Sequence, residues 1–362
     1  MLIVDGHEDI AWNMLALGRD YTLSAAEIRQ REQGTRNPEV NGDTLLGWPD
    51  YQRGRVAVVF STLFSAPDRA KLGDWDTLVY KTFDQARQLY LNQLDAYHRL
   101  AGEHPDMYRL VQTQADLQEV LQHWERSDTD EHPVGLVVLM ENAESVRQPA
   151  ELEEWWVGGV RMIGPAWAGT RFCGGTREPG PLTRDGYALL SRMEEFGFTL
   201  DLSHMDETAA LQALDSYQGP IIASHANALA LLKGSESNRH LTDAVMRGLL
   251  ERGGTIGVVP ANNFLRPGWK DSGGRAIVTL EHVAAQIDYI CQAAGDARHA
   301  GLGSDFDGGF GLQSVPSDVD TIADLQKLVP MLAARGYSQE DISAIMGGNW
   351  LAHLKRFLPE VV

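Results

Sequence analysis

Short apolar runs recur along the chain, and each is followed by a polar segment. The runs are continuous rather than alternating, which is typical of strands buried on both faces of a parallel sheet. Val, Ile and Leu are prominent in most of them. The pattern predicts eight strands, over residues 2–4, 56–64, 134–140, 159–167, 198–203, 220–224, 254–260 and 300–304.

Segments with helical periodicity lie between these runs. Their apolar residues recur at spacings of three and four, so each segment would present one apolar face to a core. They cover residues 77–101, 184–196, 241–252 and 279–294. Strands that alternate with helices predict an α/β fold, and eight such strands favour a closed (β/α)8 TIM barrel over an open doubly wound sheet.

No change in composition divides the chain into two parts. Its 362 residues lie within the range of one barrel domain, so we expect a single domain over residues 1–362. Residues 18–54 are polar and contain several Gly and Pro residues. They are predicted to form an insertion after the first strand.

Residues that bind metals or move protons follow five of the predicted strands. His7 and Asp9 follow the first, and in an extended chain they would face one side while Glu8 faces away. The third, fifth, sixth and eighth runs are followed by Glu141, His204, His225 and Asp305. In a (β/α)8 barrel these strand ends meet at one face, so we expect the side chains to converge. Imidazoles with carboxylates are the ligand set of Zn²⁺ or a similar divalent ion, and a carboxylate can bridge two ions.

Each of these residues also has an ordinary structural explanation when it is taken alone. A histidine after a strand is commonly held by hydrogen bonds, and an acid there commonly caps a helix or faces solvent. Spacing does not separate Glu141 from Glu144, or Asp305 from Asp307. The joint placement of the set at the strand ends favours a metal site.

Composition narrows the possible partners. The chain has 31 Lys and Arg against 50 Asp and Glu, a formal charge of −19, so we expect no nucleic acid partner. No stretch approaches the ~20 apolar residues of a membrane helix, and the N-terminus lacks the pattern of a signal peptide. The two cysteines, Cys173 and Cys291, cannot form a disulfide framework, which indicates a reducing compartment. We therefore expect a cytoplasmic protein with a small-molecule substrate and no membrane contact, with a homodimer left open.

An ordered set of motifs resembles the membrane dipeptidase (renal dipeptidase) family of zinc peptidases. The motifs are DGHEDI, VGLVVLMENAES, DLSHMD, PIIASHANA, SNRHLTD, GLGSDFDG and GGNWL, between residues 5 and 351. The resemblance implies a (β/α)8 barrel, two zinc ions and hydrolysis of dipeptides, often with a D-residue tolerated at the C-terminal position. By position, it implies that His7 and Asp9 bind one zinc, that His204 and His225 bind the other, and that Glu141 bridges both.

The resemblance also assigns roles around the metals. It implies that Arg239 binds the substrate carboxylate, for which a guanidinium fork is well suited. It implies that Asp305 is the catalytic aspartate, which would take a proton from water and pass it to the departing nitrogen.

The chain departs from the family pattern at positions near the metals. Glu8 replaces the usual Asn, but it is expected to face away from the site. Where the family's fourth strand ends in a histidine that contacts substrate, this chain offers Trp167. An indole can fill a pocket and donate one N–H, but it cannot accept a proton or carry a positive charge. Trp167 is therefore predicted to line and narrow the substrate pocket.

Two other functions fit the same residues. A binuclear barrel hydrolase acting on another small amide, a lactone or an ester would share the metals and differ in the pocket. A catalytically weakened homologue would use the barrel mouth to hold a ligand, which Trp167 favours and the intact set of metal-site residues opposes. The fold decides none of these alternatives, and the sequence favours a metallo-dipeptidase.

Overall fold

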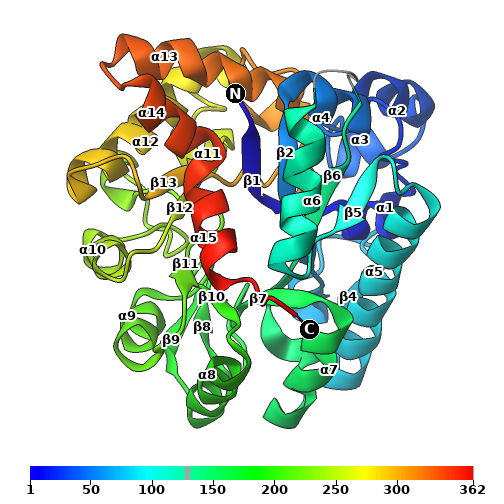
Figure 1. The fold of residues 1–362 in the computed structure, drawn as a ribbon, viewed down its shortest axis with the longest axis vertical. Helices are drawn as coiled ribbons and strands as arrows, with labels where there is room; N and C mark the ends of the chain where they lie inside the picture. The colour runs from blue at the N-terminus through cyan, green and yellow to red at the C-terminus, as the bar shows by residue number, and fades with distance from the viewer. Residues whose placement is uncertain (127–130, 362) are drawn as a thin grey trace.

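The fold is that of a computed structural model, which describes residues 1–126 and 131–361 of the chain. Every predicted apolar run contributes a strand to a parallel sheet that is nearly closed on itself (Figure 1). The strands of the barrel are β1 (Ile3–Glu8), β2 (Val56–Leu63), β6 (Val134–Glu141), β7 (Val160–Gly164), β10 (Thr199–Asp201), β11 (Ile221–Ile222), β12 (Ile256–Val258) and β13 (Ala300–Leu302).

The strands follow chain order around the barrel. β13 pairs in parallel with β1 and so joins the end of the series to its beginning. Between β11 and β12 the sheet is closed by a parallel bridge from Ala223 to Ile256. The predicted (β/α)8 TIM barrel is confirmed, and the open doubly wound sheet is wrong. The short β5 (Tyr108–Leu110) adds a further parallel pairing to β6.

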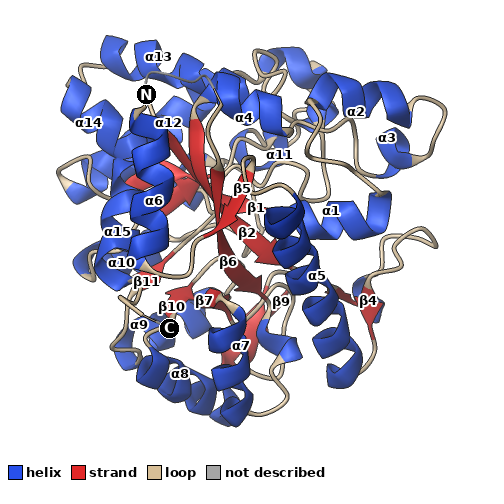
Figure 2. Cartoon of the chain, turned by 45° about the vertical axis from the view of Figure 1, so that its right-hand side comes forward, coloured by secondary structure: helices blue, strands red, loops and turns tan. Residues whose placement is uncertain are grey.

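Helices surround the strands (Figure 2). The segments with predicted helical periodicity form α5 (Phe83–Glu103), α8 (Arg184–Phe196), α10 (Asp243–Glu251) and α12 (Leu280–Ala294). The other helices outside the insertion are α1 (Ile10–Leu17), α6 (Gln114–Glu125), α7 (Leu152–Gly158), α9 (Glu207–Ser216), α11 (Asn262–Leu265), α13 (Leu328–Ala334), α14 (Gln339–Ser343) and α15 (Asn349–Phe357).

The helix expected from residue 77 begins later, at Phe83. Its first expected residues instead form β4 (Val79–Tyr80), which pairs with β3 (Ala66–Pro67). The Thr82 hydroxyl then accepts a hydrogen bond from the Gln85 N–H at 3.3 Å and caps the helix. Local capping chemistry therefore sets the boundary that periodicity misplaced.

Residues 18–54 fold into short helices on the side of the barrel where β2 lies (Figure 1). These helices are α2 (Ala25–Glu32), α3 (Asn37–Val40) and α4 (Trp48–Gly54). The insertion is tied to the barrel by polar contacts. Tyr51 donates to the Glu8 carboxylate, which places Glu8 on the outer side of β1, as expected.

The barrel interior changes character along the strands. On β6, Val137 and Leu139 belong to one apolar cluster, which also contains the buried Trp350 of α15. Inward positions recur every second residue in a strand, so the next inward side chain is the acid Glu141. The inward positions of β6 thus carry apolar side chains inside the barrel and a carboxylate at its C-terminal mouth.

Within residues 1–126 and 131–361, no helix combines the length and apolar character needed to cross a bilayer.

Candidate metal centre and substrate cavity

Residues that follow different strands meet at the C-terminal end of the barrel. Ligand atoms of His7, Asp9 and Glu141 lie within 4.8 Å of one another, and so do those of Glu141, His204 and His225. Glu141 therefore belongs to both groups. Asp305 joins His7 and His225 in a further group of the same size.

Glu141 lies at the centre of this arrangement. Its Oε1 is 3.0 Å from His204 Nε2 and 3.4 Å from His225 Nε2. Its Oε2 is 3.7 Å from His7 Nε2. The two oxygens of one carboxylate thus lie near different histidines, as a carboxylate that bridges two metal ions requires.

The chemistry of the cluster fits divalent metal ions. Burial lowers the pKa of His7, His204 and His225 well below the usual value, which favours the neutral imidazole that binds metal. Within the described residues, neither ring nitrogen of His7 has a hydrogen-bond partner. Buried polar atoms are costly when they are left unpaired. A nitrogen and oxygen donor set of this kind suits Zn²⁺ and similar ions.

Neighbouring side chains fix the orientation of the histidines. Ser224 Oγ lies 2.8 Å from His225 Nδ1 and donates to the buried Asp201 carboxylate. Thr176 Oγ1 lies 3.0 Å from His204 Nδ1. Each contact occupies Nδ1 and leaves Nε2 directed at Glu141. Such partners hold ligand rings in place and tune their basicity.

Two buried acids, Asp5 and Asp201, precede His7 and His204 and accept hydrogen bonds from the backbone of neighbouring segments. Asp201 accepts from the Ser203 and Ser224 N–H groups at 3.0 and 2.8 Å. Asp5 accepts from the Ser304 N–H at 2.6 Å and so links β1 to the loop after β13.

The backbone is unusual at these strand ends. His204 has a φ of 67° and Asp305 a φ of 56°, both in the left-handed region that non-glycine residues rarely adopt. Backbone strain of this kind persists where surrounding structure enforces it, and it concentrates at functional sites. Both residues lie three positions beyond their strands, which end at Asp201 and Leu302, and both belong to the groups of ligand atoms described above.

Arg239 lies buried beside the histidines. Its Nη2 donates to the His225 carbonyl oxygen at 2.7 Å. Its Nε and Nη1 have no hydrogen-bond partner among the residues that the structure describes. The guanidinium therefore has donors available for an anionic ligand.

A cavity of about 520 Å³ opens above this cluster. Asp9, Glu141, His204, Arg239 and Asp305 all contribute to its wall, so the predicted metal and catalytic residues face one space. Its volume is in the range of small-molecule sites.

Trp167 also lines the cavity, but it does not end a strand. β7 ends at Gly164, and the following Pro165 has no N–H with which to continue the ladder. Trp167 lies in the next loop, with its ring centroid 5.2 Å from that of Phe64 and 6.1 Å from that of His204. The residue is close to the predicted ligands although the predicted strand end was wrong.

Several further residues of the cavity wall had no sequence signal that marked them as functional. They lie on loops and short helices whose positions depend on the whole fold, and include Trp12, Phe64, Arg69, Asp76, Arg177 and Phe264. Asn263, in the polar segment after the seventh run, lines the cavity too.

Asp307, the alternative to Asp305, is engaged elsewhere. Its carboxylate accepts from Tyr21 Oη at 2.7 Å and from the Leu45 N–H at 2.9 Å, and it pairs with Arg19 at 3.1 Å. All three partners belong to the insertion, so Asp307 fastens residues 18–54 to the mouth of the barrel.

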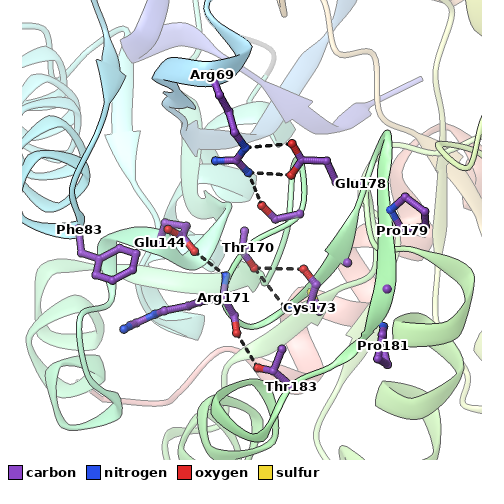
Figure 3. Close-up of a pocket in the computed structure, with 13 residues that line it drawn as sticks. Arg69, Phe83, Glu144, Thr170, Arg171, Cys173, Glu178, Pro179, Pro181 and Thr183 are labelled. Atoms are coloured by element: carbon purple, nitrogen blue, oxygen red, sulfur yellow. Dashed lines mark hydrogen bonds and ion pairs between the residues drawn. The ribbon is translucent and has the colours of Figure 1, made fainter.

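An open cleft of about 480 Å³ adjoins the cavity, and Arg69 and Glu178 line both spaces (Figure 3). Arg69 Nε and Nη2 donate to the two Glu178 oxygens at 2.9 and 2.7 Å, and Nη2 also donates to the Gly169 carbonyl oxygen at 2.6 Å. Glu144, the alternative to Glu141, lines this cleft and accepts from the Arg171 N–H at 2.8 Å.

The sequence is similar to that of a known peptidase family over almost its whole length. The sequence model of the family described as membrane dipeptidase (Peptidase family M19) matches residues 1–357. Dipeptidase ataJ of Aspergillus terreus is 30% identical over 380 residues, covering 98% of this chain and 84% of that protein.

Two solved structures have the same fold. The probable dipeptidase PvdM from Pseudomonas aeruginosa has a TM-score of 0.79 at 20% identity, covering 99% of this chain and 96% of that chain. A metallopeptidase from Rhodobacter sphaeroides, liganded with a phosphinate mimic of the dipeptide L-Ala-D-Ala, has a TM-score of 0.77 at 22% identity, covering 99% of both chains.

Proposed function

The chain belongs to the membrane dipeptidase family, peptidase family M19, which makes it a hydrolase of peptide bonds, and from that premise we propose a dipeptidase with two zinc ions. The family implies metal ions. Their number and identity, the tolerance of a D-residue at the C-terminal position, and the roles of individual residues are our proposal.

The convergence of His7, Asp9, Glu141, His204 and His225 at one cavity carries this proposal. His7 and Asp9 would hold one ion, His204 and His225 the other, and Glu141 both. When bound, divalent ions supply Lewis acidity that polarises the scissile carbonyl and makes water a better nucleophile.

Asp305 would carry the proton in this reaction. Burial raises the pKa of its carboxyl well above the usual value, and the residue lines the cavity that would receive the substrate. Asp305 would accept a proton from the attacking water at a carboxylate oxygen and donate it to the departing amine nitrogen.

Arg239 would bind the C-terminal carboxylate of the substrate. Its unpartnered Nε and Nη1 offer donors beside the metal cluster, and a guanidinium recognises a carboxylate through paired hydrogen bonds. The free carboxylate would then select short peptides. The L-Ala-D-Ala mimic bound to the Rhodobacter sphaeroides relative supports the proposed tolerance of a D-residue.

A comparison of substrates tests the proposal. The Zn²⁺-supplemented protein should hydrolyse L-Ala-L-Ala and L-Ala-D-Ala. Amidation of the substrate C-terminus should cost about 2–5 kcal/mol in transition-state binding, because Arg239 would lose its charged partner. Equal kcat/KM for acid and amide would remove Arg239 from the proposed role. Hydrolysis of lactones or esters without hydrolysis of dipeptides would overturn the proposed function.

A further inference from the structure

Arg177 lies at the tip of a hairpin that reaches the catalytic cavity. The hairpin is formed by β8 (Cys173–Gly175) and β9 (Glu178–Leu182), and Arg177 is part of the cavity wall. In the described part of the chain, no ion pair and no side-chain hydrogen bond engages its guanidinium. An arginine that faces a substrate cavity without an acidic partner is available to a ligand.

The other arginines of the cavity differ from Arg177. Arg69 is neutralised by Glu178, with two parallel hydrogen bonds between the facing side chains (Figure 3). Arg239 is buried beside the histidines and would be used by the substrate's C-terminal carboxylate. The positive charge of Arg177 therefore remains unpaired, both by acidic residues described in the structure and by the C-terminal carboxylate of the substrate.

The backbone around Arg177 is firmly held. Its N–H donates to Asn238 Oδ1 at 2.9 Å, and Asn238 Nδ2 donates to the Gly175 carbonyl oxygen at 2.9 Å. Thr176, the preceding residue, contacts His204 at 3.0 Å. The hairpin tip is thus fixed to the metal-site loop on one side and to the segment of Arg239 on the other.

The conformation of Arg177 is also costly for its residue type. Its φ is 66° in a turn between two strands, where glycine or asparagine is favoured. A long cationic side chain at such a position indicates a use that outweighs local strain.

We propose that Arg177 binds a negatively charged side chain on the C-terminal residue of the substrate, so that dipeptides ending in Asp or Glu are preferred. The inference rests on the proposed dipeptidase function. Asn238 directly precedes Arg239 in the chain and fixes the Arg177 backbone, and both arginines line the same cavity. One would bind the main-chain carboxylate and the other the side-chain carboxylate.

The test compares Ala-Asp with Ala-Asn, which have nearly the same shape and differ in charge. Both configurations of the second residue are assayed with the Zn²⁺-loaded enzyme. We expect kcat/KM for Ala-Asp to exceed that for Ala-Asn at least about tenfold, as for hydrogen bonds to charged groups. Arg177→Gln should bring the ratio to about one, and Arg177→Lys should keep part of it.

Arg99→Gln is the matched control. It removes the same charge from an exposed position on α5 that pairs with Asp95, and the ratio should not change. Because both peptides are assayed on one preparation, the ratio does not depend on the fraction of folded enzyme. A wild-type ratio near one, or an Arg177→Gln ratio equal to that of wild type, would overturn the inference.

Failure of the proposed dipeptidase function can be distinguished experimentally from failure of the inference about Arg177. If the loaded enzyme cleaves no dipeptide, including Ala-Ala, the dipeptidase proposal fails, and thermal stabilisation by Ala-Asp and Ala-Asn then decides the role of Arg177. Greater stabilisation by Ala-Asp that disappears in Arg177→Gln would support an anion-binding role. Equal stabilisation by both peptides would refute it.

Discussion

The two ends of the barrel interior are built from the same strands and have opposite chemistry. Toward the N-terminal end, Val4 and Val58 belong to a buried apolar cluster together with Trp350, whose indole N–H donates to the Leu302 carbonyl oxygen at 2.9 Å. Toward the C-terminal end, the inward positions carry His7 and Glu141. There, both ring nitrogens of His7 are buried without a partner among the described residues.

The contrast between these two parts of the barrel suggests that residues inside it determine stability and residues at its mouth determine activity. Packed apolar side chains with satisfied polar groups stabilise a fold, whereas clustered buried ionisable groups destabilise it unless a ligand compensates them. The left-handed residues His204 and Asp305 also lie at the C-terminal mouth. We therefore expect substitutions at the mouth to affect metal binding and turnover, and substitutions at the opposite end to affect the free energy of unfolding.

The largest effect is expected from Glu141→Ala. The Glu141 carboxylate oxygens lie 3.0 Å from His204 and 3.7 Å from His7, so its loss would remove the carboxylate that we propose to bridge two cations. We expect metal content after Zn²⁺ supplementation to fall well below two ions per chain and turnover to become undetectable. Metal analysis and a dipeptide assay measure the two effects.

Glu144→Ala is the matched control for this variant. Glu144 is a buried acid just beyond the same strand, but it lines the neighbouring cleft. The Glu144→Ala variant should retain both metal ions. Equal metal loss in the two variants would mean that buried charge near the mouth, rather than ligation by Glu141, holds the metals.

The next largest effect is expected from Asp305→Asn. The change keeps size and hydrogen bonding but abolishes proton acceptance, so kcat should fall ~10² to 10⁴-fold while metal content is unchanged. Unchanged kcat would assign proton transfer to another group. Asp307→Asn offers a contrast, because Asp307 is engaged by Tyr21 and Leu45 of the insertion; it should lower the free energy of unfolding more than it lowers kcat.

The barrel was predictable from the sequence because its strands are buried on both faces. Continuous apolar runs such as 56–64 and 134–140 mark such strands directly, and their alternation with amphipathic helices fixes the topology. The convergence of His7, Glu141 and His225 followed from that topology, since parallel strands of a barrel end at one face. For the barrel strands, the apolar pattern of the sequence and the observed topology agree.

Features that depend on long-range placement of loops were not predictable. Gly164 ends β7 because Pro165 interrupts the ladder, and Trp167 therefore lies in a loop rather than at a strand end. Arg69 and Arg177 line the cavity from segments that lie outside the ligand motifs in the sequence. Periodicity reports only on the nearest neighbours of a residue, so it cannot place such side chains.

Trp350→Ala tests the apolar cluster that fills the barrel beneath the mouth. The side chain is fully buried and packs against Phe60 at a ring-centroid distance of 5.0 Å. We expect a loss of about 3–5 kcal/mol in the free energy of unfolding, as for other large aromatic truncations, measured by urea denaturation. Metal content and kcat of the folded fraction should stay near wild type. If this variant does not fold, Trp350→Phe provides the milder change, and a fall in its kcat at full metal occupancy would contradict the proposed separation.

The smallest effect is expected from Trp167→His, which tests how a loop residue at the mouth of the barrel affects turnover. Trp167 packs against Phe64 and lies near His204, so its indole occupies space beside the predicted metal ligands. An imidazole is smaller and can donate or accept a hydrogen bond. A well-placed donor to developing negative charge contributes ~10² to 10³ in rate, but a side chain on a loop is held less precisely than one at a strand end. We therefore expect kcat/KM for Ala-Ala to rise by only about tenfold, with metal content unchanged.

Trp167→Ala opens the same space without supplying an imidazole, and an equal gain in that variant would assign the effect to volume alone. Flat or reduced turnover in Trp167→His, with fold and metals intact, would show that the indole does not restrict dipeptide hydrolysis.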